Sequence, residues 1–156
     1  MALKVGVKAP EFSLFDTARN EVSLSGLAGK VVVLHFFPAA FSKTCTAQVC
    51  TSRDELASYS MPDLSVFGVS VDMPYALAAF KQQQGINFEL LSDANKKMIH
   101  EYEMYHCNFS FGIKGVAKRG VVVIDKNGII AYAEETENLG VQVDFEALKK
   151  KLEELK

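Results

Sequence analysis

The sequence predicts an α/β fold with a mixed β-sheet, and three patterns in its 156 residues support this prediction. Two continuous apolar runs, residues 30–37 ("KVVVLHFF") and 64–71 ("LSVFGVSV"), are typical of strands buried on both faces of a sheet. Each run is followed by a segment that predicts a helix, residues 42–60 and 72–85. Near the C-terminus, "KNG" joins two further β-rich runs, which indicates a hairpin. Strands that alternate with helices and end in a hairpin are typical of the α/β class.

The remaining segments complete this order. A short antiparallel strand pair precedes the first buried run, a short strand follows the second helix, and an amphipathic helix ends the chain. Between them, Asp93 is expected to cap a third helix. The ranges are 11–16 and 21–26 for the pair, 88–92 for the strand, 94–104 for the Asp93-capped helix and 143–155 for the last helix. This order is that of a thioredoxin-like fold with an N-terminal β-hairpin extension, in a single domain over residues 1–156.

Composition excludes several classes of function. The chain is 49% hydrophobic and 23% charged, with a formal charge of −2 and a pI of about 5.9, so it lacks the basic character of a nucleic-acid binder. Its N-terminal residues "MALKVGVKAPEFSL" contain no apolar core of a signal peptide. No apolar run approaches the roughly 20 residues that span a bilayer. We therefore expect a cytoplasmic protein without a membrane or nucleic-acid partner.

The cysteines are few but unevenly placed. The chain has three, an odd number that does not suit a secreted disulfide scaffold. Two of them, Cys45 and Cys50, lie close together where the first buried strand gives way to a helix. Structural disulfides are rare in a reducing compartment. The spacing therefore indicates redox chemistry, a metal site or coincidence.

Cys45 lies where open α/β sheets bind ligands, at the carboxyl end of a buried strand and in the first turn of a helix. Unpaired N–H groups and the helix dipole at this place favour a thiolate over a thiol. A fast enzyme would also need donors for the charge that develops on a leaving group. The candidates are the Ser42 hydroxyl, the amides at Thr44 and Cys45, and Arg119, which we expect across from Cys45 in a parallel sheet; Pro38 would shield the sulfur from water.

These residues carry a family resemblance. "PAAFSKTC" reads as Pro-x-x-x-Ser-x-x-Cys and resembles the signature of the peroxiredoxins. Four further segments, "VGVKAPEFSLFD", "VSVDMPYALAAF", "LLSDAN" and "RGVVVIDKNGIIAYAE", resemble peroxiredoxin segments in the same order. The resemblance implies that Cys45 is the peroxidatic cysteine, that Ser42 holds the peroxide, that Pro38 shields the pocket and that Arg119 activates the thiolate and orients the peroxide. It also implies that the reaction needs no metal and no organic cofactor.

Within the family, "CTAQVC" is similar to the motif of the bacterioferritin-comigratory subfamily, whereas the downstream half looks closer to the thiol peroxidase subfamily. The first similarity implies that Cys50 resolves a sulfenic acid on Cys45 as an intramolecular disulfide. The resolving cysteine of the second subfamily has no counterpart here, because Lys81 stands at that position. Packing of Cys50 in the core remains an alternative.

Helix geometry places a condition on a bond between Cys45 and Cys50. Residues five apart on an intact helix have Cα atoms roughly 8.6 Å apart. A disulfide requires less than about 7 Å. The first turns of the helix must therefore unwind when the bond forms.

The function predicted is a thiol-dependent peroxidase that reduces hydrogen peroxide and organic hydroperoxides, with thioredoxin or glutaredoxin as reductant, in a monomer or homodimer. The alternatives are a peroxide-sensing or holdase module, and a one-cysteine peroxidase resolved by an external thiol. A thiol–disulfide oxidoreductase is disfavoured because the chain has no Cys-x-x-Cys. We expect His35, Arg53 and Cys107 to be structural residues.

Overall fold

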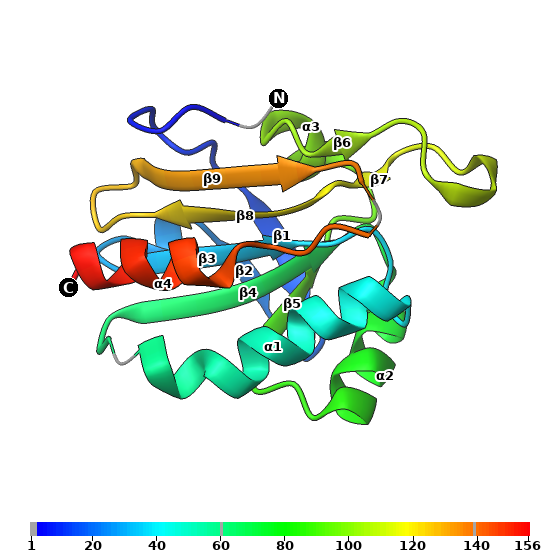
Figure 1. The fold of residues 1–156 in the computed structure, drawn as a ribbon, viewed down its shortest axis with the longest axis horizontal. Coiled ribbons are helices and arrows are strands. Elements are labelled where there is room, and N and C mark those ends of the chain that lie inside the picture. The colour runs from blue at the N-terminus through cyan, green and yellow to red at the C-terminus, as the bar shows by residue number, and fades with distance from the viewer. Residues whose placement is uncertain (1–2, 60, 139) are drawn as a thin grey trace.

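The computed structural model describes residues 3–59, 61–138 and 140–156, and it is built around one large mixed sheet (Figure 1). Seven strands make up this sheet, in the order β2-β1-β5-β4-β3-β8-β9. The three central strands β3, β4 and β5 run parallel, and every other pairing in the sheet is antiparallel. The strands are β1 (Ser13–Asp16), β2 (Glu21–Ser23), β3 (Val31–Phe36), β4 (Leu64–Ser70), β5 (Glu89–Ser92), β8 (Arg119–Ile124) and β9 (Ile130–Thr136).

Helices cover both faces of the sheet (Figure 1). They are α1 (Lys43–Tyr59), α2 (Pro74–Gln84), α3 (Lys97–Glu101) and α4 (Phe145–Glu154). Two single 3-10 turns, η1 (Ser25–Leu27) and η2 (Ser110–Gly112), and a small pair of strands, β6 (Tyr105–His106) and β7 (Val116–Ala117), lie in the connections. The mixed sheet, the flanking helices and the N-terminal β1–β2 hairpin agree with the prediction. No helix in the described part of the chain is long and apolar enough to cross a bilayer.

Strands β3 and β8 divide the core into two layers, because all twelve of their residues are buried and successive side chains point to opposite faces. On one face, Val31, Val33 and Phe37 pack with residues of α1, α2 and α4. On the other, Leu34 and Phe36 pack with residues of α3 and of the N-terminal segment. The prediction of strands buried on both faces is confirmed for this part of the sheet.

The third helix is shorter than predicted. We expected residues 94–104, whereas α3 spans only Lys97–Glu101. Lys96 and Glu103 both adopt left-handed backbone conformations, with φ of 62° and 54°, which interrupt a right-handed helix on either side. The Asp93 carboxylate still accepts hydrogen bonds from the amides of Met98 and Ile99, as a helix-capping acid does.

The direction of β8 also differs from the prediction. We expected Arg119 to face Cys45 in a parallel sheet, but β8 runs antiparallel to β3, with Gly120 opposite Phe36. An antiparallel strand begins beside the end of its neighbour, so the first residue of β8 lies at the carboxyl end of β3. A parallel strand would have placed Arg119 at the other end of the sheet, far from the start of α1.

Candidate active site

Cys45 is the third residue of α1, and its side chain is only 1% exposed. The start of the helix is fixed by Ser42, whose carbonyl oxygen accepts from the Thr46 amide at 2.9 Å and from the Thr46 hydroxyl at 2.7 Å. A thiol in this first turn lies near the positive end of the helix dipole. The structure thus holds the sulfur in a fixed position within the core.

Arg119 donates directly to this sulfur. Its Nη1 lies 3.2 Å from the Sγ of Cys45 and 3.1 Å from the Oε1 of Gln48. The Arg119 side chain is buried, and its Nε has no hydrogen-bond partner among the described residues. A buried guanidinium needs anionic or polar partners, and here it contacts the sulfur of Cys45 and the amide oxygen of Gln48. The Nε–H is therefore a further donor of Arg119 that no described residue uses.

Gln48 is the site residue that sequence reasoning missed. It is fully buried, and its Nε2 donates to the carbonyl oxygens of Phe36 at 3.1 Å and Gly120 at 3.4 Å. Because the Nε2 of Gln48 is bonded to the ends of both strands, the Oε1 on the other side of the amide accepts from Arg119. The available signal was its spacing, because a residue three positions after Cys45 lies on the same face of the helix.

The loop before α1 is held by Asp72 at the end of β4. The Oδ2 of Asp72 accepts from the amide of Ala40 at 2.9 Å and from the hydroxyl of Ser70 at 2.7 Å. Phe41, the next residue of the loop, has a left-handed φ of 72°, which costs free energy for a residue with a side chain. Asp72 therefore helps to keep a strained turn directly in front of the site.

The other two loop residues that were predicted for the site also lie here. The Ser42 hydroxyl donates to the carbonyl oxygen of Ala39 at 2.8 Å. Pro38 is buried, two residues after the end of β3. Ser42, Pro38, Cys45 and Arg119 thus come from the carboxyl end of β3, the start of α1 and the start of β8.

Cys50 lies further along α1 in a different environment. It is partly buried, packs against the core, and its thiol donates to the Oε1 of Gln84 at 3.5 Å. Arg53, one turn later, donates to the carbonyl oxygen of Gln84 and pairs with Asp54 at 2.8 Å. Both Cys45 and Cys50 belong to one continuous helix, so the geometric condition on their bonding applies to this structure.

The first turn of α1 is also tied to the C-terminal part of the chain. The Nε2 of Gln142 donates to the carbonyl oxygen of Thr44 at 3.2 Å, and its Oε1 accepts from the amide of Val143. The segment between β9 and α4 thereby contacts the turn that carries Cys45. This contact must break if the turn unwinds.

His35 and Cys107 lie apart from this cluster. His35 is fully buried, and its Nε2 lies 3.0 Å from the Ser52 hydroxyl, while its Nδ1 has no partner among the described residues. Burial lowers the pKa of His35 from 6.5 to about 4, so the ring is neutral near pH 7. Cys107 is an exposed free thiol in the connection between β6 and β7.

Fold and site together define a class of protein. A buried cysteine at a helix start, in contact with a guanidinium at the carboxyl end of a central strand, is suited to nucleophilic redox chemistry of sulfur. The class is a thiol-dependent oxidoreductase on a thioredoxin-like sheet. Such a site can attack an electrophile and stabilise the negative charge that results.

Comparison with known proteins identifies the family. A family model described as "AhpC/TSA family" matches residues 5–133. The chain belongs to this family and is a peroxiredoxin of the Bcp type, a thiol peroxidase that acts on peroxides. The predicted family, fold class and enzyme class are therefore confirmed.

Individual relatives agree with this assignment. A Mycobacterium tuberculosis protein (strain H37Rv) named as a peroxiredoxin is 38% identical over 134 residues, or 85% of each chain. Peroxiredoxin Bcp of Escherichia coli K12 is 34% identical over 103 residues, or 66% of each chain. The crystal structure of BcpB from Mycobacterium tuberculosis superimposes with a TM-score of 0.85 at 25% identity, covering 99% of each chain. A peroxiredoxin-like protein from Aquifex aeolicus gives a TM-score of 0.89 at 25% identity, over 100% of this chain and 90% of the other.

Proposed function

We propose that this peroxidase reduces hydrogen peroxide and organic hydroperoxides through a sulfenic acid on Cys45, which Cys50 resolves as an intramolecular disulfide and thioredoxin then reduces. The contact of 3.2 Å between the Arg119 Nη1 and the Cys45 Sγ is the observation that supports this most directly. A cation at that distance favours the thiolate and supplies a donor at the place where charge develops.

In the first step, the Cys45 thiolate attacks one oxygen of the hydroperoxide. A sulfur–oxygen bond forms, the oxygen–oxygen bond breaks, and the departing oxygen takes up a proton to leave as water or an alcohol. We expect the Nε–H of Arg119, which has no partner among the described residues, to donate to a peroxide oxygen. Because the Ser42 hydroxyl already donates to Ala39, its oxygen is left to accept a hydrogen bond from the peroxide. Pro38 excludes water from the sulfur.

In the second step, the Cys50 thiol attacks the sulfenic sulfur, and a disulfide and water are formed. The two Cα atoms on the intact helix are roughly 8.6 Å apart, so the first turns of α1 must unwind. The bonds that oppose this motion are those from Gln142 to Thr44 and from Thr46 to Ser42. Cys50 packs against the core, and the hydrogen bond that its thiol makes to Gln84 is weak and must break when the residue moves.

The reductant and the compartment are also part of the proposal. A disulfide at the surface created by unwinding is open to a dithiol protein, so we propose thioredoxin, with glutaredoxin as the alternative. All three cysteines are free thiols in the structure, which fits a reducing compartment, and we place the protein in the cytoplasm.

Cys45→Ser tests the identity of the nucleophile. A hydroxyl is a far weaker nucleophile than a thiolate at neutral pH, so we expect peroxide consumption to be abolished. The measurement is peroxide loss in the presence of dithiothreitol, which reduces the enzyme without a protein partner. Cys107→Ser is the matched control, because it removes an exposed thiol outside the site and should leave the activity unchanged. Full activity of Cys45→Ser would refute the assignment.

Cys50→Ser tests the resolving step separately. We expect one equivalent of peroxide to oxidise Cys45 at the rate of the unchanged protein, since Cys50 does not contact the sulfur of Cys45 in the reduced structure. Turnover with thioredoxin should stop, and mass spectrometry should find a sulfenic acid on Cys45 where the unchanged protein forms a Cys45–Cys50 disulfide. Normal turnover of this variant with thioredoxin would show that an external thiol resolves the sulfenic acid.

A further inference from the structure

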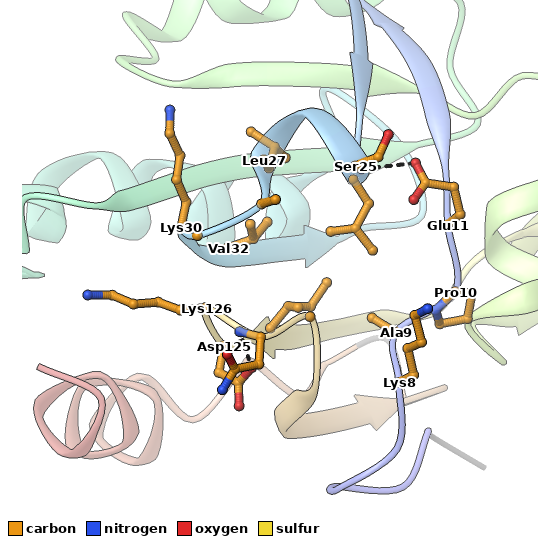
Figure 2. Close-up of a pocket in the computed structure, with 16 residues that line it drawn as sticks. Lys8, Ala9, Pro10, Glu11, Ser25, Leu27, Lys30, Val32, Asp125 and Lys126 are labelled. Atoms are coloured by element: carbon orange, nitrogen blue, oxygen red, sulfur yellow. Dashed lines mark hydrogen bonds between the residues drawn. The ribbon is translucent and has the colours of Figure 1, made fainter.

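A cavity of about 600 Å³ lies at the amino end of β3, between the N-terminal segment, the η1 region and the turn that joins β8 to β9 (Figure 2). Its rim carries lysines together with the carboxylates of Glu11 and Asp125, so its charge favours no single kind of ligand. Cys50 and the residue that binds its thiol do not line this cavity. The polar groups around Cys50, in the middle of α1, form a more specific arrangement.

Cys50 and Arg53 of α1 are both bonded to the last residue of α2. The Cys50 thiol donates to the side-chain Oε1 of Gln84 at 3.5 Å, and the Arg53 Nη1 donates to the backbone carbonyl oxygen of the same residue. Residues three apart on a helix are neighbours on its surface, with Cβ atoms about 5–6 Å apart. Gln84 therefore holds the thiol and the guanidinium close to each other.

Cys50 lies within the electric field of Arg53. The hydrogen bond to Asp54 raises the pKa of Arg53 most, and the charge of a Cys50 thiolate raises it further. A cation that an anion stabilises also stabilises that anion. Asp54 binds the guanidinium at Nε, at 2.8 Å, but its side chain is 65% exposed, against 30% for Arg53. Water therefore screens the carboxylate more than the guanidinium, and a net positive field remains at the thiol.

The resolving reaction needs such a field, because the thiolate and not the thiol is the nucleophile. In the structure the proton of Cys50 points to an amide oxygen, which is neutral and does not take up the proton. Cys50 also lies about two turns into α1, past the first turn in which the helix dipole favours an anion. Cys45 has the helix start and Arg119, whereas the cation beside Cys50 is Arg53.

We propose that Arg53 assists the resolving step by stabilising the thiolate of Cys50. This rests on the proposed function, in which Cys50 resolves the sulfenic acid on Cys45. Cys50 gives its proton to water, its sulfur forms a bond to the sulfenic sulfur, and the sulfur–oxygen bond breaks. The departing hydroxide takes up a proton and leaves as water, so Cys50 is oxidised and the sulfenic sulfur is reduced. Arg53 follows Cys50 in the helix and stays beside it when the turns before Cys50 unwind.

The first test measures the reactivity of Cys50 itself. Cys45→Ser with Cys107→Ser leaves Cys50 as the one thiol of the chain, and its alkylation at neutral pH depends on the thiolate. Iodoacetamide is neutral, so a nearby charge acts on the thiol and not on the reagent. Adding Arg53→Gln should slow alkylation about threefold, the size of a partly exposed charge interaction. Adding Asp54→Asn should instead speed it, by up to about twofold, because the guanidinium loses its counter-charge.

The sign of the change separates charge from structure. Loss of the bond from Arg53 to Gln84 would loosen α1 from α2, expose the thiol and speed its alkylation, whereas loss of the positive charge slows it. Arg53→Lys keeps the charge and should stay within about twofold of the protein with Arg53. Lys97→Gln is the matched control, because it removes a paired cation from α3, on the other face of the sheet, and should change nothing.

The second test follows disulfide formation in the chain that keeps all three cysteines. After one equivalent of peroxide, the Cys45–Cys50 disulfide should form about threefold more slowly in Arg53→Gln, while Cys45 is oxidised at an unchanged rate. If the unchanged protein forms no such disulfide, the resolving role of Cys50 is refuted, and this proposal with it. Equal rates of disulfide formation in the two proteins, or faster alkylation in Arg53→Gln, would overturn the role of Arg53 alone.

Discussion

Two buried polar clusters lie under helix α1. One contains a charged side chain, and the other contains a neutral one. The first, under the first turn, joins Cys45, Gln48 and the guanidinium of Arg119. The second, about two turns further along, consists of the ring of His35 and the hydroxyl of Ser52. Arg119 keeps its charge, whereas burial lowers the pKa of His35 to about 4 and leaves it neutral.

The difference lies in what each group can bind. A buried charge is tolerated only where polar or anionic partners replace water. Arg119 has a sulfur and an amide oxygen, whereas His35 has one hydroxyl and a ring nitrogen without a partner among the described residues. Only the first cluster can therefore stabilise an anion, and Cys45 is the member of that cluster that can form one.

The largest effect is expected from Arg119→Ala. Removing a donor placed at a developing charge typically costs about a hundredfold to a thousandfold in rate, and we expect a loss of this size in the oxidation of Cys45 by peroxide. The rate is measured by rapid quenching with a thiol-alkylating reagent and mass spectrometry. An unchanged rate would remove Arg119 from the chemistry.

Arg119→Lys is the matched control for this experiment. It keeps the charge but loses the fork of donors that lets one side chain bind a sulfur, an amide and a peroxide together. We expect a rate between those of the unchanged protein and of Arg119→Ala. Equal rates for the two variants would show that charge alone contributes nothing, and would leave the geometry of the fork as the whole effect.

The second cluster predicts a dependence of stability on pH. The unfolded chain binds a proton at His35 near pH 6.5, and the folded chain only near pH 4. The contribution of His35 to the stability should therefore fall as the pH drops from 6.5 towards 4 and change no further below. Each pH unit in this interval is worth about 1.4 kcal/mol, so the free energy of unfolding should fall by up to about 3 kcal/mol.

Urea unfolding at a series of pH values measures this effect. His35→Leu should remove most of this pH dependence, because leucine fills the site without a titrating group. His100→Asn is the control, since His100 is exposed and should keep the dependence of the unchanged protein. A curve for His35→Leu as steep as that of the unchanged protein would contradict the assignment of this effect to His35.

Much of the first cluster could be predicted from the sequence, because its chemistry is local. Cys45 and Ser42 lie in one motif at a strand–helix junction, and buried apolar runs identify the strands that hold them. The direction of β8 could not be predicted, because a continuous apolar run has the same pattern in parallel and antiparallel strands. The limits of α3 were not predicted because Lys96 and Glu103 adopt left-handed backbone conformations, which lysine and glutamate rarely do.

The residues that hold the site in place were harder to recognise. The sequence places Asp72 only at the start of a predicted helical segment, whereas its carboxylate binds the amide of Ala40, 32 positions earlier. Gln48 binds backbone groups on two strands that come together only in the folded sheet. An amide or carboxylate that acts through such distant contacts has no short sequence pattern.

Gln48→Leu is expected to have a smaller effect than Arg119→Ala and than the titration of His35. Leucine fills a similar volume but leaves the Arg119 guanidinium without one of its two partners and the carbonyl oxygens of Phe36 and Gly120 without their donor. Because Gln48 positions Arg119 and does not touch the sulfur, we expect about a tenfold fall in the rate of Cys45 oxidation, in the range of one lost hydrogen bond to a charged group.

Gln48→Glu keeps an acceptor for Arg119 and should be slower than the unchanged protein but faster than Gln48→Leu. In the Arg119→Ala background, Gln48→Leu should cause no further loss, since the group it positions is gone. A full additional tenfold loss in that double variant would mean that Gln48 acts on Cys45 by another route, and that the first cluster does not work as one unit.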